Sequence, residues 1–429
     1  MNTTVQSLMA EPPGTALPWL ATLREAGRTR FTEMGLPTPR QESWKYTNLR
    51  ALEQIDFGAA PPETVGIDRL PFLMPAGASE HRLVFVNGRY RADLSALDHL
   101  PEGAHLGGLA ELLERRPDLI ERHLGQIAEG EAQPWRALND AMMADGLVLG
   151  LSRDARVATP IEVIYIAAAD QAPLACHPRN LIVLEPGAHA TLVEHHISLG
   201  ETATLSNGVT EVHLKDGATL HHYKMQAEGQ NAFHLNTLHA RVERNAHYDT
   251  FEMSLGSQLS RNEIAVRLVG PGANCHVNGA YLMRGQQHCD TTTTIEHLAP
   301  HTSCREVFKG VLDDRARAVF QGRIVVHPGA QKADGHQLSK AMLLSDQAEI
   351  DAKPELEIYA DDVKCSHGAT AGELDKQALF YLRARGIPEA RARSILVEAF
   401  LSETIDAISA EDLCPAFLAS IADWLKTEQ

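Results

Sequence analysis

The chain has few basic residues, few cysteines and no long apolar run. Across 429 residues it has 39 Lys and Arg against 56 Asp and Glu, a formal charge of −17. This balance argues against binding to nucleic acid or to an anionic membrane, because both require a basic protein surface. No window approaches the roughly 18 uninterrupted apolar residues of a membrane span. The six cysteines form no CxxC pair, so we expect reduced thiols in a cytoplasmic protein rather than a disulfide framework.

Sequence motifs of self-contained enzymes are also missing. The chain has no G-x-x-x-x-G-K-[ST] phosphate loop, no G-x-S-x-G elbow and no H-E-x-x-H. Aromatic residues make up only 5% of it. This low content argues against a carbohydrate-active or carbohydrate-binding solenoid, which we keep as the alternative function. Residues Met1 to Leu17 lack a basic stretch followed by a long apolar core, so no signal peptide is expected.

Short β-branched runs separated by tight turns dominate the middle of the chain. Each of these turns follows one apolar run and precedes another. Alanines mark the turns at positions 188, 218, 246, 273, 316 and 348, at intervals of 30, 28, 27, 43 and 32 residues. This period predicts a solenoid of stacked strands, with a β-sandwich as the alternative. The longest interval contains residues 288–294 and is interpreted as an extra partial coil or an edge loop.

Helical patterns flank the β-rich region. Apolar residues follow helical spacing over 18–34 and 109–124, with a short extended insert at 83–87, and again over 375–385, after Pro388 and from Pro415. We predict a mainly helical domain over residues 1–155, a solenoid over 156–370 and a helical domain over 371–429. The last three helices have more apolar surface than they can bury among themselves, so they either pack against the end of the solenoid or dock another protein.

Cys365 and His367 stand two residues apart in an extended segment at the junction between the solenoid and the last helices. Alternate residues of a strand point to one face, so these two side chains should project together, away from Lys364 and Ser366. A thiolate beside an imidazole suits a soft metal or a sulfur species. Two ligands cannot close a tetrahedral site, so the pair is either half of a shared site or structural.

Other histidines are expected to be structural. The adjacent pairs His195-His196 and His221-His222 lie in strand-like surroundings, where only one member of each can face the interior. The segment 332–337, with Asp334, His336 and Gln337 among its residues, is interpreted as a polar turn.

Several blocks of this sequence resemble the SufB/SufD family of the bacterial SUF iron–sulfur cluster assembly system. The resemblance covers most of the chain and rests on Glu42–Thr47 (ESWKYT), Phe320–Ile324 (FQGRI), Lys332–Gln337 (KADGHQ), Asp361–Thr370 (DDVKCSHGAT), Leu379–Arg383 (LFYLR) and Arg385–Pro388 (RGIP). At the position of Cys365–Gly368 in this chain, the pattern of the SufB branch is Glu-His-Glu-Ala. The chain is therefore more similar to the SufD branch.

The resemblance implies a right-handed parallel β-helix between two helical domains. It also implies a non-catalytic scaffold that assembles with one SufB and two copies of the ATPase SufC, which agrees with the missing phosphate loop. No cofactor would bind stably; transient iron or a nascent cluster would bind at His367, with Cys365 as a less certain ligand, opposite SufB. As an alternative to this complex, the isolated chain is expected to form a homodimer. SufC would dock on the last helices, at residues that include Phe380, Tyr381, Arg383, Gly386, Ile387 and Phe400.

Overall fold

The structure is a computed structural model of the whole chain, and it describes residues 7–9, 17–59, 79–97, 100–127, 133–169 and 171–426. Most of the segment 1–17, where no signal peptide is expected, lies outside the described residues. No helix in the described part is both long enough and apolar enough to cross a membrane.

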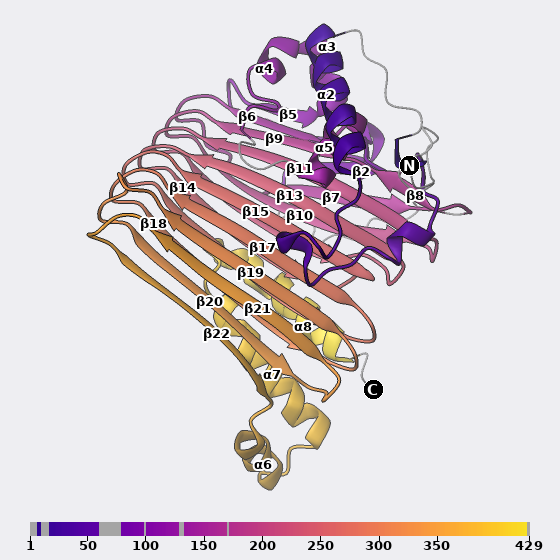
Figure 1. Cartoon of the computed structure of the whole chain (residues 1–429), viewed down its shortest axis with the longest axis vertical. Helices are drawn as coiled ribbons and strands as arrows, with labels where there is room; N and C mark the ends of the chain where they lie inside the picture. Colours follow the sequence, from indigo (N-terminus) through magenta and orange to yellow (C-terminus); the bar gives the residue numbers. More distant parts are fainter. Residues whose placement is uncertain are drawn as a thin grey trace.

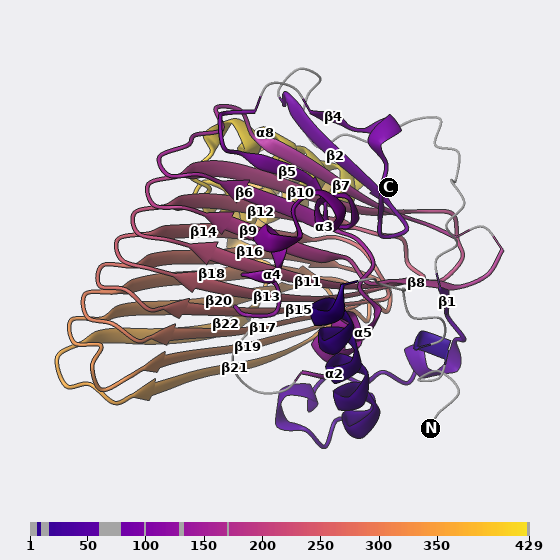
Figure 2. The ribbon, with the colours of Figure 1, turned by 90° about the horizontal axis from the view of Figure 1, so that it is seen from above.

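Two long parallel sheets form a β-solenoid of about 8 turns (Figures 1 and 2). From β9 onward, successive strands alternate between the sheets and neighbours within a sheet are parallel, whereas β5–β6 and β2–β3 are antiparallel pairs near the N-terminal end. The first sheet runs β5 (His105–Gly108), β6 (Leu147–Leu151), β9 (Arg179–Leu184), β11 (Thr204–Leu214), β13 (Ala232–Val242), β15 (Leu259–Leu268), β17 (His288–His297), β19 (Arg317–Val326) and β21 (Glu349–Ile358). The second runs β3 (Arg89–Tyr90), β2 (His81–Val86), β7 (Ile161–Ala168), β10 (His189–Leu199), β12 (Thr219–Ala227), β14 (His247–Ser254), β16 (Asn274–Met283), β18 (Ser303–Leu312), β20 (Asp334–Leu343) and β22 (Lys364–Glu373).

The predicted parallel solenoid is confirmed, and the sandwich alternative is wrong because the long strands from β7 to β22 pair in parallel rather than as hairpins. Short strands β1 (Gly58–Ala59), β4 (Ala96–Leu97) and β8 (Leu174–Cys176) pair at the margins. Strands β2 and β6 come from the first third of the chain and pair with β7 and β9. Both sheets therefore continue into the region that was expected to be mainly helical.

The interval of 43 residues between alanine-marked turns has a different origin from the one expected. Ala188 to Ala273 precede strands of the second sheet, whereas Ala316 and Ala348 precede β19 and β21 of the first. Thr302 takes the place of Ala273 one coil later, because Ser303 pairs with Asn274. The series of alanines therefore combined turns from two different corners of the solenoid. Residues 288–294 are neither an extra partial coil nor an edge loop, because they belong to the full strand β17.

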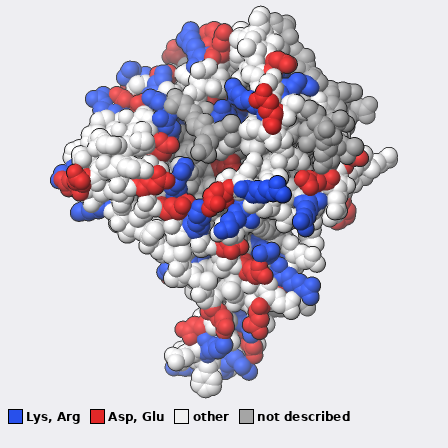
Figure 3. Space-filling view, in the orientation of Figure 1, with Lys and Arg blue, Asp and Glu red and all other residues white. Residues whose placement is uncertain are grey.

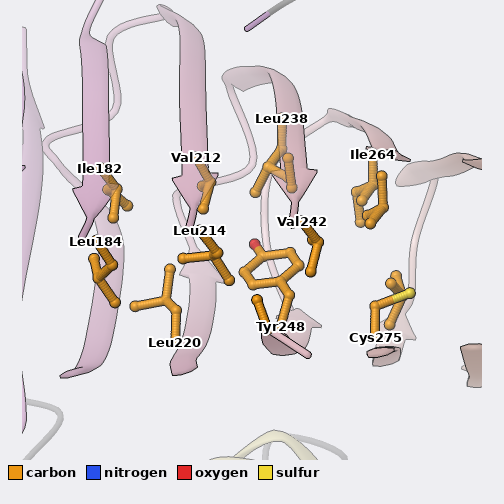
Figure 4. Close-up of a cluster of buried hydrophobic side chains, with 14 of the residues drawn as sticks. Ile182, Leu184, Val212, Leu214, Leu220, Leu238, Val242, Tyr248, Ile264 and Cys275 are labelled. Carbon is orange, nitrogen blue, oxygen red and sulfur yellow. The ribbon is translucent and has the colours of Figure 1, made fainter. Parts of the chain in front are cut away.

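Apolar side chains from both sheets fill the solenoid interior (Figure 4). Ile182, Val212 and Ile264 point inward from the first sheet, and Leu220 and Tyr248 meet them from the second. All five are at most 2% exposed. Burial of each such side chain stabilises the fold by roughly 1.5–3 kcal/mol.

The outer face of the first sheet is covered by N-terminal elements. Helices α2 (Pro18–Met34), α3 (Leu109–Arg115), α4 (Pro117–Glu121) and α5 (Pro134–Met142) contribute to two buried clusters with residues of β9, β11, β13 and β15. The short helical turns η1 (Glu42–Trp44) and η2 (Leu52–Gln54) join this region, whereas η3 (Ala92–Leu94) packs through Leu94 on β2 and β7 of the second sheet.

Residues 42–57, which we call the N-terminal strap, cross several coils of the first sheet. The Trp44 ring lies 3.9 Å from the Arg261 guanidinium, and Arg261 Nη2 donates to the Ser43 carbonyl at 2.9 Å. Thr47 donates to Asp290 at 2.5 Å. At its start, Glu42 pairs with Lys353 of β21 at 2.8 Å. The ESWKYT block therefore connects the N-terminal region to the last strand of the first sheet.

C-terminal helices cover the outer face of the second sheet. In α7 (Glu389–Ile405) and α8 (Cys414–Lys426), residues such as Val397, Leu401 and Phe417 pack on Tyr223 and Phe251. The turn η4 (Glu411–Leu413) joins these two helices. These helices lie on a face of the solenoid rather than at its end. Helix α6 (Lys376–Ala384) buries no residue and extends from the narrow end of the molecule in Figure 1.

Candidate functional site

The last coil of the solenoid ends in two open strands. Strands β21 and β22 each stand at the end of their sheet and, within the described part of the chain, pair with one neighbour only. Each therefore presents a row of backbone N–H and C=O groups that a further strand can bind. We call the exposed end formed by these two strands the rim.

His367 and Cys365 lie on β22, on the side that continues the solenoid interior. Cys365 pairs with Gly335 and packs against the apolar interior, whereas His367 pairs with Gln337 and is exposed. Ser366 points to the opposite side, where its hydroxyl lies 2.6 Å from His336 Nδ1. Partial burial raises the pKa of the Cys365 thiol above its ordinary value.

Beneath His367 lies a buried polar pair. Gln337 Nε2 donates to Glu306 Oε2 at 2.6 Å, and both side chains are at most 3% exposed. Burial raises the pKa of Glu306 to about 7. Gly322 of β19 makes room for this arrangement, since a Cβ there would lie 2.1 Å from Gln337 Nε2. The blocks FQGRI and KADGHQ therefore meet directly inward of His367.

A second row of inward-facing residues runs beside the row formed by Glu306, Gln337 and His367. Cys275, Cys304, Gly335 and Cys365 are register partners on β16, β18, β20 and β22. His297, at the end of β17, brings its Nε2 to 3.2 Å from Cys304 Sγ. Among the described residues, no group of three His, Cys, Asp or Glu side chains is already arranged to hold a metal ion.

The adjacent histidine pairs behave as structural residues. His196 and His222 face inward, and each places Nε2 about 3 Å from a Glu194 carboxylate oxygen, at 2.9 and 3.0 Å. Burial would raise the pKa of Glu194, but hydrogen bonds from the two imidazoles outweigh burial and hold that pKa below its ordinary value. His221 is partly exposed on the outer face, near His189 and His247. In each adjacent pair, one histidine (His196 or His222) faces the interior, as the alternation of side chains along a strand requires.

The surface expected to dock a partner is only partly contiguous. Phe380 and Tyr381 of α6 are 73% and 57% exposed, and Arg383 and Gly386 are exposed beside them, with Ile387 half-buried. Arg385 stacks on the Tyr381 ring at 4.8 Å. Phe400 lies apart from this group, because its ring and carbonyl contact Lys309 of β18. In Figure 3, basic and acidic side chains are interspersed around the narrow end.

Four residues near the rim were not singled out as site residues: Glu306, Gln337, His297 and Cys304. Gln337 was assigned to a polar turn, but residues 334–343 form strand β20, so its side chain points inward. The signal was present in the spacing, because Cys304 and Glu306, like Cys365 and His367, stand two residues apart on equivalent strands.

Comparison with known proteins agrees with this architecture. Residues 165–400 match the family model for the SufBD core domain of SUF system FeS cluster assembly, and residues 13–163 match the SufBD protein N-terminal region. An iron–sulfur cluster assembly SufBD family protein of Synechocystis sp. is 30% identical over 91% of this chain and 87% of its own length. The iron–sulfur cluster assembly protein SufD of Escherichia coli is 31% identical, covering 91% of this chain and 90% of that protein. SufD of Bacillus subtilis is 25% identical, covering 92% and 91%. The chain therefore belongs to the SufBD family of the SUF system and has a role in iron–sulfur cluster assembly.

Proposed function

We propose that this chain is a non-catalytic scaffold subunit that pairs with SufB through its rim and holds the ATPase SufC on its C-terminal helices. The observation that carries the proposal is the position of His367, an exposed imidazole on the open strand β22. Iron or a nascent cluster, as cargo, would bind between this imidazole and ligands of SufB. Nucleotide-driven motion of SufC would twist the paired solenoids and open the shared site.

The two open strands differ in how they accept a partner strand. Strand β21 carries four acidic residues, one lysine and Pro354. Because Glu349 N–H bonds inward to Ala316, alternation along a parallel strand places the missing N–H of Pro354 on the open side. Charges and proline on an edge oppose pairing with another strand. These features favour β22 over β21 as the pairing edge.

Strand β22 has the opposite character. Residues 366–372 are small except for His367, so a partner backbone can approach closely. Lys364 N–H bonds to Ala333 of the preceding turn, which places the N–H groups of odd-numbered residues, His367 included, on the open side. A SufB strand paired along β22 would therefore bring its side chains next to the His367 imidazole.

Helix α6 supports the docking of SufC. Phe380 and Tyr381 are adjacent, large and mostly exposed, on a helix that buries none of its own residues. Exposed apolar side chains of this size on one short element typically mark a protein interface. We extend the docking surface to Arg383, Gly386 and Ile387, which follow on the same segment, and retain Phe400 as its proposed inner margin.

The proposed compartment is the cytoplasm. All six cysteines are free thiols, and Cys365, at the rim, needs its reduced form to act as a ligand. A reducing compartment meets this requirement.

Co-expression with SufB and SufC tests the proposal. We expect the three chains to co-purify and to assemble a cluster on anaerobic reconstitution with iron and sulfide. Ala369→Pro removes an N–H on the open side of β22 and should abolish capture of SufB, whereas the matched control Ala352→Pro on β21 should not. A wild-type complex with Ala369→Pro would show that β22 is not the pairing edge. Cluster assembly by SufB and SufC at full yield without this chain would overturn the scaffold function.

The isolated chain provides a second readout. Without SufB, the same open edge should pair with a second copy, so light scattering should detect a homodimer that Ala369→Pro converts to monomer. A homodimer unaffected by that substitution would place the self-contact elsewhere.

A further inference from the structure

His297 and Cys304 form a buried donor pair inward of the rim. Cys304 Sγ lies 3.2 Å from His297 Nε2, and the two residues are 3% and 0% exposed, respectively. Thr302 donates its hydroxyl proton to the Ala299 carbonyl at 3.0 Å, so its oxygen accepts from His297 Nδ1–H at 2.8 Å. This arrangement assigns the proton to Nδ1 and leaves the Nε2 lone pair directed at the sulfur.

An imidazole held in this way has the form that metal ligands require. Histidine ligands usually donate one ring N–H to a neighbouring acceptor, which orients the other nitrogen toward the ion. Ligands at about 2.0 Å (N) and 2.3 Å (S) from a tetrahedral ion stand roughly 3.5 Å apart. The pair is therefore already close to the separation that chelation needs.

Gly335 leaves space beside this pair. A Cβ at Gly335 would lie 3.5 Å from Cys304 Sγ and 3.5 Å from His297 Nε2, so hydrogen alone occupies that position. Gly335 separates Cys304 from Cys365 in the same inward row, one strand on either side. With strands roughly 4.8 Å apart, a thiol from each flanking strand can reach a point above the glycine.

We propose that Cys304, His297 and Cys365 bind one borderline divalent transition-metal ion, of the class of Zn²⁺ or Fe²⁺, in the space over Gly335. Cys365 supplies the third ligand by turning its thiol inward from its half-buried position. The two thiols release their protons to solvent as the ion enters, and two thiolates then balance its two positive charges. Such a neutral assembly suits a buried position, and thiolate with imidazole is the donor set these ions prefer. The site shares Cys365 with the proposed function but needs no partner subunit.

Anaerobic titration of the reduced, isolated full chain with Co²⁺, followed by Zn²⁺ displacement, tests the site. We expect one ion per chain with thiolate-to-cobalt charge-transfer absorption. Cys304→Ser, His297→Gln and Cys365→Ser should each weaken binding at least about tenfold. Cys275→Ser, in the same row but deeper, and Cys414→Ser, on α8, are the matched thiol controls and should bind as wild type. Absence of thiolate absorption, or equal loss in Cys275→Ser, would overturn the proposal.

Two further variants test the position of the ion and the identity of its ligands. Gly335→Ala keeps every donor and meets only ordinary contacts, so it should fold with an unchanged melting temperature and still lose the ion. Wild-type affinity in Gly335→Ala would contradict the position of the ion. His367→Ala should bind Co²⁺ normally, which separates this site from the cluster site proposed at the SufB interface; loss of the ion in that variant would contradict the ligand set.

Discussion

Gln337 donates a hydrogen bond to Glu306 at 2.6 Å, one strand inward of His367. The amide is a register partner of His367, and the carboxyl is a register partner of the amide. This buried pair lies directly inward of the exposed imidazole, and it connects the rim to the interior of the preceding coil.

The Glu306 carboxyl should make stability depend on pH. Burial raises its pKa to about 7, so the folded protein keeps a proton that the unfolded chain loses above its ordinary value near 4.5. The stability contributed by the protonated carboxyl is present below about 4.5 and is lost as pH rises toward 7. The difference amounts to roughly 3 kcal/mol. Urea unfolding across this window should show the loss in wild type and not in Glu306→Gln; parallel curves for both proteins would contradict it.

Gly322 should be intolerant of a side chain. Gly322→Ala places a methyl group 2.1 Å from Gln337 Nε2 and 2.8 Å from the Phe320 ring, so one of them must move. Overpacking of this kind costs about 1–3 kcal/mol, which chemical denaturation can measure. The control Gly329→Ala meets no atom within 4 Å and should change stability by less than about 0.5 kcal/mol. Equal stability of the two variants would count against the packing described beneath His367.

The N-terminal strap should stabilise the solenoid mainly through Trp44. Trp44 is 3% exposed and stacks on the buried Arg261, so Trp44→Ala should cost about 3–5 kcal/mol in unfolding experiments. Lys353→Ala breaks only surface ion pairs, with Glu42 and with Glu355, and should leave the denaturation midpoint unchanged. If the tryptophan variant unfolds at the wild-type midpoint, the strap has no stabilising role.

Substitutions on α6 should separate binding from stability. Phe380→Ser and Tyr381→Ser remove exposed apolar surface, so the melting temperature should not fall, while SufC capture should weaken. Phe417→Ser, at a fully buried position on α8, is the contrasting control and should lower the melting temperature. If a variant that carries both α6 substitutions binds SufC as well as wild type does, the docking surface lies elsewhere.

The sequence predicted the solenoid because turn residues recur where strands must change sheet. It could not separate the two corners, since a small buried residue precedes a strand at both, as Ala273 and Ala316 show. The mixed series of turns therefore hid the full strand β17. The extended insert expected at 83–87 lies largely in strand β2. Strand β6 was missed because helical patterns surround it, and the pairing of β2 and β6 with β7 and β9 is a long-range choice.

The rim residues Cys365 and His367 could be predicted from a local rule, because spacing of two within one strand fixes a shared face. Their inner neighbours could not. Which coil lies under which depends on the register over about 30 residues, and only that register brings Glu306, Gln337 and Cys304 beneath the rim. Gln337 was assigned to a polar turn, whereas it lies within strand β20.

The most direct test of the account is the cluster yield of His367→Ala in complex with SufB and SufC. His367 is exposed and contributes nothing to the buried core, so the variant should assemble with both partners in wild-type proportions. Anaerobic reconstitution, followed by absorption spectroscopy and iron determination, should then show that cluster formation is strongly reduced. Full cluster yield from that intact complex would contradict the assignment of His367 as a ligand for the cargo.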